Sequence, residues 1–244
     1  MNINNGLTVL ADVRPGANRI TAVRRALEGR ATPVYLEIGV SRGFVFQRIS
    51  ADEKIAVDPA FKLSERSRHL ADSKARATHY YETTSDAFFE NETAFLEKRP
   101  IDVALIDGQH SYQQVVRDVE NTLRYLRDDG VIVLHDCNPR NALIGRPAAS
   151  YAEFMAQQTG PLAIGAWSGD VWKAIVHLRS TRDDLRVAVL KCDFGVGVVR
   201  KGSPESRLAF SLAQIEALDY PDLAADREHL LNLKPPRYLS KLLV

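Results

Sequence analysis

The chain has 244 residues, a length that suits one domain or about one and a half. Its 45% hydrophobic and 26% charged residues are typical of a globular protein and exclude general disorder, a collagen-like repeat and a disulfide scaffold. The 32 lysines and arginines against 31 acids give a net charge of +1. This balance gives no reason to expect nucleic acid or an anionic membrane as the main partner.

Compartment signals in the sequence are few. Cys137 and Cys192 cannot form a disulfide framework and share no short metal-binding spacing, so we expect two reduced thiols. Residues 1–10 lack a basic segment followed by an apolar one, the pattern of a secretory signal. No apolar run approaches the roughly 20 residues of a membrane-spanning helix. These features predict a cytoplasmic protein without a membrane partner.

Short apolar runs that suit buried strands alternate with helical patterns, which predicts an α/β fold with a mostly parallel sheet. The predicted strands are 34–40, 54–59, 78–85, 101–108, 131–136, 171–178, 185–194 and 195–202, the last two forming a hairpin. The predicted helices are 17–29, 43–50, 61–76, 86–98, 111–127, 151–158 and 206–225. Residues 138–150, rich in proline and glycine, are expected to form a loop that walls or covers a site.

Polar residues follow the ends of the first five predicted strands. Because ligands of open parallel sheets collect outside the carboxyl ends of the strands, we expect these side chains to share one site. They are Glu37, Gly39, Gly43, Asp58, Thr84, Ser85, Asp107, His110, Asp136 and Asn138.

The first of these turns, from Glu37 to Gly43, has the spacing G-x-x-x-G rather than the G-x-G-x-x-G of a pyrophosphate-binding turn. Its glycines allow a tight bend and a close approach of a ligand. An acid before Gly39 would repel a phosphate but suit an ammonium group. Asp58, 21 residues after Glu37, ends the next strand, where a carboxylate can accept both hydroxyls of a ribose.

This glycine turn and the following acid resemble the first two motifs of the class I S-adenosylmethionine-dependent methyltransferases. The resemblance covers about residues 33–200 and implies a doubly wound, mostly parallel seven-stranded sheet with a C-terminal antiparallel hairpin. One methyltransferase domain would then span residues 1–244, with a helical extension at 1–32 and a helical tail at 201–244.

The same resemblance implies positions for the cofactor, S-adenosylmethionine. Glu37 and Gly39 would lie near its methionine end, Asp58 would hold the ribose, and Thr84 and Ser85 would lie near the adenine. The residues expected to bind it are Glu37, Gly39, Ser41, Gly43, Asp58, Thr84, Ser85 and Asp107. Ser41 stands where many members of the family have a middle glycine.

A second pattern is D-G-x-H at Asp107–His110, followed by H-D-x-N at His135–Asn138. Carboxylates on adjacent strand ends can bind a hard divalent cation, and Mg²⁺ is the natural candidate. A hydroxyl bound to such a cation loses its proton more easily. His110 would then be the general base, and the resulting alkoxide would attack the methyl carbon in line with the departing sulfur.

This second pattern resembles the metal-dependent sugar and natural-product O-methyltransferases. The resemblance implies Asp107, Asp136 and Asn138 as metal ligands and His110 as base. Macrolide-sugar enzymes carry two adjacent acids on the fifth strand, where this chain has His135 and Asp136. The sequence leaves open whether His135 is a ligand, a second base or neither.

The expected partner is a small hydroxylated molecule, a sugar or a secondary metabolite. Trp167 and Trp172 either wall its pocket or pack in the core. The alternatives are a metal-independent methyltransferase acting on an amine or carboxyl oxygen, a nicotinamide-dependent dehydrogenase and a non-catalytic cofactor-binding protein. The missing G-x-G-x-x-G argues against the dehydrogenase. Dimerisation through the N-terminal helix and the C-terminal tail stays open.

Overall fold

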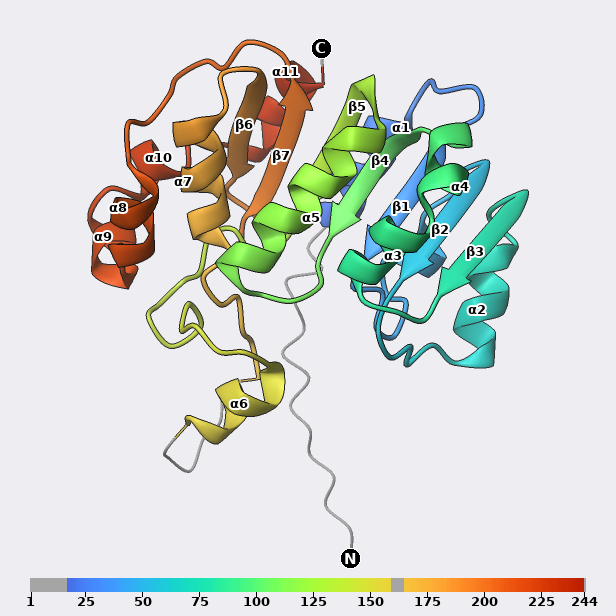
Figure 1. Ribbon diagram of the computed structural model, residues 1–244, viewed down its shortest axis with the longest axis horizontal. Coiled ribbons are helices and arrows are strands. Elements are labelled where there is room, and N and C mark those ends of the chain that lie inside the picture. The colour runs from blue at the N-terminus through green and yellow to red at the C-terminus, as the bar shows by residue number, and fades with distance from the viewer. Residues whose placement is uncertain (1–16, 159–164, 244) are drawn as a thin grey trace, which may run out of the picture.

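The computed structural model describes residues 17–158 and 165–243. Its central sheet has eight strands in the order β3-β2-β1-β4-β5-β7-β6-β8 (Figure 1). These are β1 (Val34–Ile38), β2 (Glu53–Val57), β3 (Ala77–Tyr81), β4 (Ile101–Ile106), β5 (Leu126–Leu134), β6 (Leu185–Leu190), β7 (Val196–Lys201) and β8 (Leu233–Lys234). The first five are parallel, and β7 is antiparallel to β5 and β6. The predicted Rossmann-like sheet with its antiparallel hairpin is confirmed, and the short β8 adds a strand.

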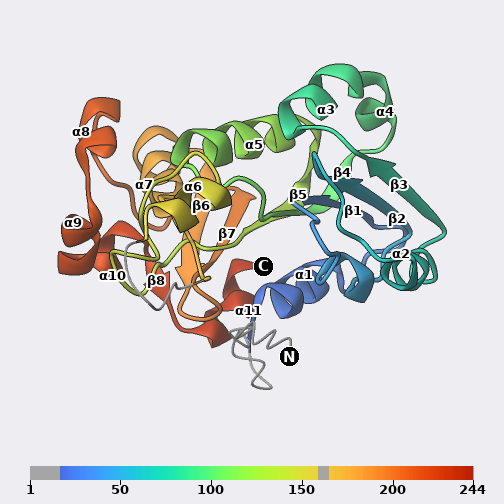
Figure 2. The same cartoon turned by 90° about the horizontal axis from the view of Figure 1, so that it is seen from below.

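Helices cover both faces of the sheet (Figure 2). One hydrophobic core joins the sheet to α3 (Ser85–Asn91), α4 (Thr93–Lys98), α5 (Tyr112–Tyr125) and α7 (Trp172–Thr181). The core on the other face includes α1 (Arg19–Leu27), α2 (Glu65–Asp72) and α11 (Leu239–Leu242). The remaining helices are α6 (Tyr151–Ala156), α8 (Leu212–Ala217), α9 (Tyr220–Ala225), α10 (Arg227–Leu230) and the 3₁₀ turns η1 (Phe46–Arg48) and η2 (Pro236–Tyr238). Among the described residues, none of these helices combines the length and apolarity needed to cross a membrane.

One predicted strand is wrong. Residues 171–178 form most of helix α7, which is buried almost all round, its polar Lys173 and Arg179 included. A helix that is apolar on every side shows no amphipathic period, so its sequence reads like a buried strand. Of the two alternatives for Trp172, a pocket wall or core packing, the structure shows core packing, with 1% of the residue exposed.

Several predicted helices are shorter than expected. Residues 43–50 contain only the η1 turn, and 61–76 contain only α2. The segments 86–98 and 206–225 each hold two short helices. In the first segment, Glu92 is the C-cap of α3 and the N-cap of α4. In the second segment, each helix starts at its own capping box. Local caps divide what the apolar period alone reads as one helix.

The strand order reverses between β1 and β4, and their carboxyl ends are held unusually close. Gly39 follows β1 with φ +87°, a conformation that favours glycine. A Cβ atom at Gly39 would lie 2.2 Å from the Asp107 carbonyl oxygen. Only glycine therefore lets the turn after β1 pack against the backbone that presents Asp107.

We expect Gly39→Ala to destabilise the protein by at least ~2 kcal/mol more than Gly29→Ala, as measured by chemical denaturation. Gly29 is the matched control, because its φ is +81° but an added Cβ there meets nothing within 4 Å. Both variants carry the left-handed backbone strain, so their difference isolates the clash with Asp107. Equal losses of stability would contradict the proposed close contact.

Candidate active site

A cavity of about 500 Å³ lies at the carboxyl ends of β1, β2 and β4. Its wall is completed by the start of α3, by part of α5 and by Ala149–Tyr151 and Trp167 from the region after β5. Six of the eight residues predicted to bind the cofactor line it, namely Gly39, Ser41, Asp58, Thr84, Ser85 and Asp107. The predicted meeting of several strand ends at one site therefore holds for these six.

Asp58 follows β2 directly, and its carboxylate organises the two neighbouring turns. Oδ2 accepts a hydrogen bond from the Ser41 backbone N–H at 2.7 Å, and Oδ1 accepts one from Ala60 N–H at 2.8 Å. Ser41 has φ +48°, so the turn reaches Asp58 through a left-handed residue. Since a carboxylate has about four acceptor positions, both oxygens keep capacity for a ligand.

The cavity's far wall combines the start of α3 with the face of α5. Thr84 caps α3 by accepting a hydrogen bond from Ala87 N–H. The Gln114 amide of α5 donates to Ser85 at 3.2 Å and to Asp118 at 3.0 Å. Burial raises the pKa of Asp118 to about 6, although Ser85 and Gln114 oppose the rise. This wall offers hydroxyl, amide and carboxyl groups to a ligand.

Two predicted cofactor residues lie away from the cavity wall. Glu37 is 2% exposed and accepts a 2.5 Å hydrogen bond from the Tyr35 hydroxyl, because residues two apart on a strand share a face. Burial raises the pKa of Glu37 to about 8, against the opposing effect of that hydrogen bond. Gly43, with φ +72°, packs against Leu63, where a Cβ would come within 2.2 Å. Both residues contribute to the packing of the turn after β1, and neither lines the cavity.

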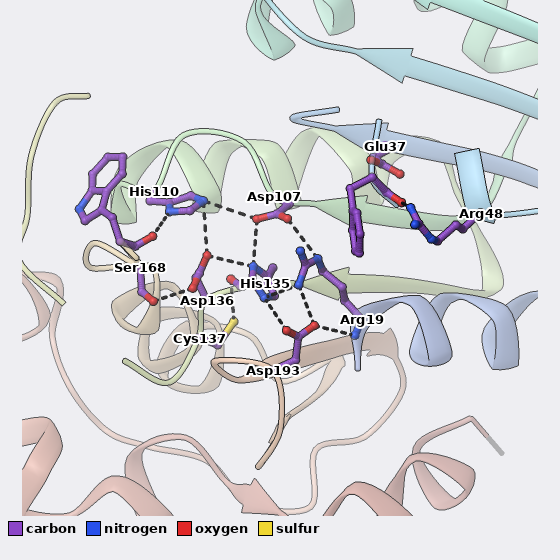
Figure 3. Close-up of polar contacts among 12 residues, drawn as sticks. Arg19, Glu37, Arg48, Asp107, His110, His135, Asp136, Cys137, Ser168 and Asp193 are labelled. Carbon is purple, nitrogen blue, oxygen red and sulfur yellow. Dashed lines mark hydrogen bonds and ion pairs between the residues drawn. The ribbon is translucent and has the colours of Figure 1, made fainter. Parts of the chain in front are cut away.

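A cluster of charged side chains lies at the ends of β4 and β5 (Figure 3). His110 Nε2 lies 3.5 Å from Asp107 Oδ1 and 3.5 Å from Asp136 Oδ2. Ligand atoms of Asp107, His110 and Asp136 all lie within 4.8 Å of one another, close enough to hold one metal ion. Asp136 has φ +60°, which is uncommon for a residue other than glycine and marks a constrained site.

His110 has a defined orientation in this group. Its Nδ1 lies 2.7 Å from the Trp167 carbonyl oxygen, which can only accept, so Nδ1 carries a proton. In the neutral ring, Nε2 therefore directs its lone pair at Asp107 and Asp136. Burial lowers the pKa of His110, but Asp136 and Asp107 outweigh it and raise the pKa.

His135 lies between the same two carboxylates and a cation. Its Nδ1 is 2.9 Å from Asp136 Oδ2 and 3.1 Å from Asp107 Oδ1, while its Nε2 is 2.9 Å from Arg19 Nη1. Burial lowers the pKa of His135, but Asp136 and Asp107 raise it well above its usual value. Burial alone would raise the pKa of Asp107. The neighbouring His135, His110 and Arg19 have the opposite effect and hold the pKa well below its usual range.

Two residues of this site, Arg19 and Asp193, were not predicted from the sequence. Arg19 begins α1, and Asp193 lies in the turn between β6 and β7. Arg19 Nη1 donates to Asp193 Oδ2 at 2.8 Å, and Arg19 Nε lies 3.4 Å from Asp107 Oδ2. The two residues are 174 positions apart, so no local pattern could have linked them.

Asn138, the predicted third ligand, points elsewhere. Its side-chain oxygen accepts a hydrogen bond from Arg227 of α10, and its backbone N–H donates to Phe194. Asp136, by contrast, accepts a 2.5 Å hydrogen bond from the Ser168 hydroxyl, which helps to fix its carboxylate. The structure thus brings His110, rather than Asn138, to the two carboxylates.

The buried Glu37 gives the stability of the protein a pH dependence. Its pKa of about 8 lies above the ordinary 4.5, so the folded state binds the proton more tightly and loses stability as pH rises between these values. Glu37→Gln mimics the protonated form. Between pH 5 and pH 8, the free energy of unfolding of wild type should fall relative to that of Glu37→Gln by on the order of 2–4 kcal/mol, at about 1.4 kcal/mol per pKa unit.

The exposed Glu28 provides the control for this measurement. Glu28→Gln removes a carboxylate that is paired only with the exposed Arg25. It should leave the pH dependence of unfolding as in wild type. A Glu37→Gln variant with the wild-type pH dependence would show that Glu37 is ionised throughout this range.

Comparisons with known proteins agree with this architecture. Residues 36–137 match the family model described as a methyltransferase domain. Among curated proteins, none matches the sequence. Similar solved structures include an O-methyltransferase from Bacillus cereus in complex with SAH, at 15% identity and a TM-score of 0.49, covering 75% of this chain and 79% of that one.

Two further structures are similar at the same low level. The SAH-bound methyltransferase PaMTH1 from Podospora anserina has 15% identity, a TM-score of 0.47 and coverage of 76% of each chain. The mycinamycin-pathway methyltransferase MycE, solved with Mg, SAH and mycinamycin VI, has 15% identity and a TM-score of 0.42, covering 75% of this chain and 47% of that one.

The family match ends at Cys137, so it contains both the turn after β1 and the Asp107–Asp136 pair. The sheet order and the cavity at its switch point are those expected for the same class. Residues 36–137 of the chain are therefore similar to a methyltransferase domain.

Proposed function

We propose that the chain transfers the methyl group of S-adenosylmethionine to a hydroxyl oxygen of a small molecule, aided by Mg²⁺ between Asp107 and Asp136. The observation that carries this proposal is the Asp107–His110–Asp136 group, of which Asp107 also lines the cavity. When bound, S-adenosylmethionine supplies an electrophilic methyl group, and the cation would make an acceptor hydroxyl more acidic.

Cofactor binding is assigned to the cavity wall. Asp58 retains acceptor positions for the two ribose hydroxyls beside its backbone partners. Thr84 and Ser85 would lie near the adenine, and Gly39 would leave the turn open to the methionine end. Glu37 is buried below this turn, where its carboxylate accepts a hydrogen bond from Tyr35.

The donor set suits a hard divalent cation. Asp107 and Asp136 offer carboxylate oxygens, which Mg²⁺ prefers. The three carboxylates of Asp107, Asp136 and Asp193 face one permanent cation, Arg19, which leaves two negative charges. A divalent cation balances them, as would protonation of both His110 and His135. Because bound metal competes with these protons, its affinity should rise with pH.

His110 is the proton acceptor of this proposal. The Trp167 carbonyl fixes the Nδ1 proton, so the basic Nε2 faces the carboxylates where the acceptor hydroxyl would be held. Its carboxylate neighbours stabilise the protonated ring after it takes the proton. Such a positioned base contributes a factor of about 10²–10⁴ to the rate.

The cavity's size and lining favour a small acceptor. A volume of about 500 Å³ falls within the range of small-molecule pockets. Tyr151 and Trp167 line it, and the Trp167 ring lies 5.1 Å from the His110 ring. Phe154 stacks behind Trp167 at 5.6 Å. An aromatic surface beside the proposed base suits the apolar face of a sugar or a planar ring.

The proposed functional unit is the whole chain. Arg227 of the C-terminal tail donates to Asn138 and to the Pro139 carbonyl, directly after the Asp136 turn. Tyr220 of α9 accepts from Arg227 and donates to the Arg140 carbonyl. The tail thereby holds the loop that leads from the carboxylates to the Tyr151–Trp167 wall.

Asp58→Ala should weaken S-adenosylmethionine binding at least tenfold in titration calorimetry, because a hydrogen bond to a charged group contributes about 1.5–3 kcal/mol. The control is Asp52→Ala, at the other end of β2, where the carboxylate pairs with Arg76. That variant should bind the cofactor as wild type does. Unchanged affinity in a folded Asp58→Ala variant would contradict the ribose assignment.

Mn²⁺, whose binding is measured by electron paramagnetic resonance, serves as a probe for the Mg²⁺ site. Substitution of a ligand residue should weaken its binding. Asp107→Asn and Asp136→Asn should each weaken binding at least ~10-fold. Asn138→Ala should change it less than ~3-fold, because its oxygen is bound by Arg227. Chelation should abolish methyl transfer to hydroxylated acceptors, whereas full activity in a chelator would support the metal-independent alternative.

The same measurement separates two roles of His110. As a base, His110→Ala should keep Mn²⁺ affinity within about threefold and lower kcat by about 10²–10⁴. A loss of Mn²⁺ affinity equal to that of Asp136→Asn would make His110 a ligand instead.

A further inference from the structure

We propose that Arg19 is a positioning residue of the metal site: its guanidinium, itself held by Asp193, keeps the His135 ring in place against Asp107 and Asp136. The inference rests on the metal site of the proposed function and extends it to the N-terminal helix. Arg19 lies outside residues 36–137, the segment that matches the methyltransferase family.

Arg19 reaches the site with both its backbone and its side chain (Figure 3). Its backbone N–H, at the start of α1, donates to Asp193 Oδ2 at 3.1 Å, and its Nη1 donates to the same oxygen at 2.8 Å. The same Nη1 lies 2.9 Å from His135 Nε2, and Nε lies 3.4 Å from Asp107 Oδ2. One guanidinium therefore contacts side chains from β4, β5 and the β6–β7 turn.

The His135 ring lies between Arg19 and the two carboxylates. Its Nε2 is 2.9 Å from Arg19 Nη1 and 3.5 Å from Asp193 Oδ1. Its Nδ1 is 2.9 Å from Asp136 Oδ2 and 3.1 Å from Asp107 Oδ1. Arg19 and Asp193 therefore contact one edge of the ring, while the other edge contacts both predicted metal ligands.

Asp193 keeps Arg19 in place and links it to the strand that carries Asp136. The turn at Asp193, Phe194 and Gly195 has three consecutive positive φ angles, of 45°, 57° and 91°. Its carbonyl oxygens accept hydrogen bonds from the backbone of Cys137 and Asn138, the two residues after Asp136. Two non-glycine residues in this strained conformation are consistent with a turn built to present Asp193 to Arg19 and His135.

A second arginine provides a control of nearly equal geometry. Arg30, beyond the end of α1, pairs with Asp102 at 2.8 Å, with side-chain exposures of 16% and 8%. The Arg19–Asp193 pair has the same distance and exposures of 16% and 9%. Arg30 ties the chain to the start of β4, so its loss tests the structural effect of a half-buried ion pair without altering the metal site.

The first test is the environment of the His135 ring in the full-length protein labelled with ¹⁵N-histidine, without added metal. Long-range ¹H–¹⁵N correlation spectra report on both ring nitrogens, and His135→Asn assigns the signals. We expect the His135 signals to move in Arg19→Gln and to keep their wild-type positions in Arg30→Gln. Unchanged His135 signals in a folded Arg19→Gln variant would overturn the proposal.

The second test is Mn²⁺ affinity, with Asp193→Asn as a further variant in case Arg19→Gln does not fold. Arg19→Gln and Asp193→Asn should each weaken Mn²⁺ binding about 10–100-fold, the usual effect of losing a group that orients a ligand. Arg30→Gln should change it less than ~2-fold. A folded Arg19→Gln variant with wild-type Mn²⁺ affinity would also overturn the proposal.

These results separate the inference from the proposed function. If wild type binds no Mn²⁺ but Arg19→Gln moves the His135 signals, the metal proposal fails and the contact between Arg19 and His135 stands. If wild type binds Mn²⁺ and Arg19→Gln changes neither the His135 signals nor the Mn²⁺ affinity, the metal site stands and the positioning role of Arg19 fails.

Discussion

Two carboxylates at the ends of neighbouring parallel strands repel each other, and the fold holds them together. Asp107 and Asp136 are buried or nearly so, where like charges are costly unless donors or cations surround them. Those groups come from every side: Ser168 on Asp136, Arg19 on Asp107, and His110 and His135 on both. Such an arrangement costs stability in a purely structural core, which is a physical reason to connect it with cation binding and catalysis.

Strained backbone conformations add to the energetic cost of holding these carboxylates together. Gly39 lets β1 and β4 come together at Asp107, while Asp136 and Asp193 adopt left-handed conformations that few non-glycine residues occupy. Gly195 allows an equally close approach, since a Cβ there would lie 2.4 Å from Asn138. The strained turns at the ends of the strands therefore depend on the buried strands that they follow. The core strands are rigid enough to hold turns that would not persist alone.

The sequence predicted the parts of this structure that depend on local chemistry. Alternating strands and helices gave the sheet and its hairpin, and the rule that strand ends meet at one edge brought Asp58 and Asp107 to the cavity and Asp136 beside Asp107. It failed where burial removes the period, as in α7, or where a cap interrupts it, as at Glu92. It also could not tell that Asn138 faces Arg227, because that contact spans 89 positions.

The largest gap between sequence and structure is also the most informative about the site. A methyltransferase domain is recognisable over residues 36–137, yet the charges that surround its carboxylates include Arg19 before that segment and Asp193 after it. Long-range partners of this kind leave no spacing to read, since each is fixed only by the folded chain. The matched segment thus contains the two carboxylates, while flanking elements supply charges that contact them. Because a small change in the orientation of a contacting group can alter metal affinity by an order of magnitude or more, those flanking elements are where proteins with a similar matched segment can differ.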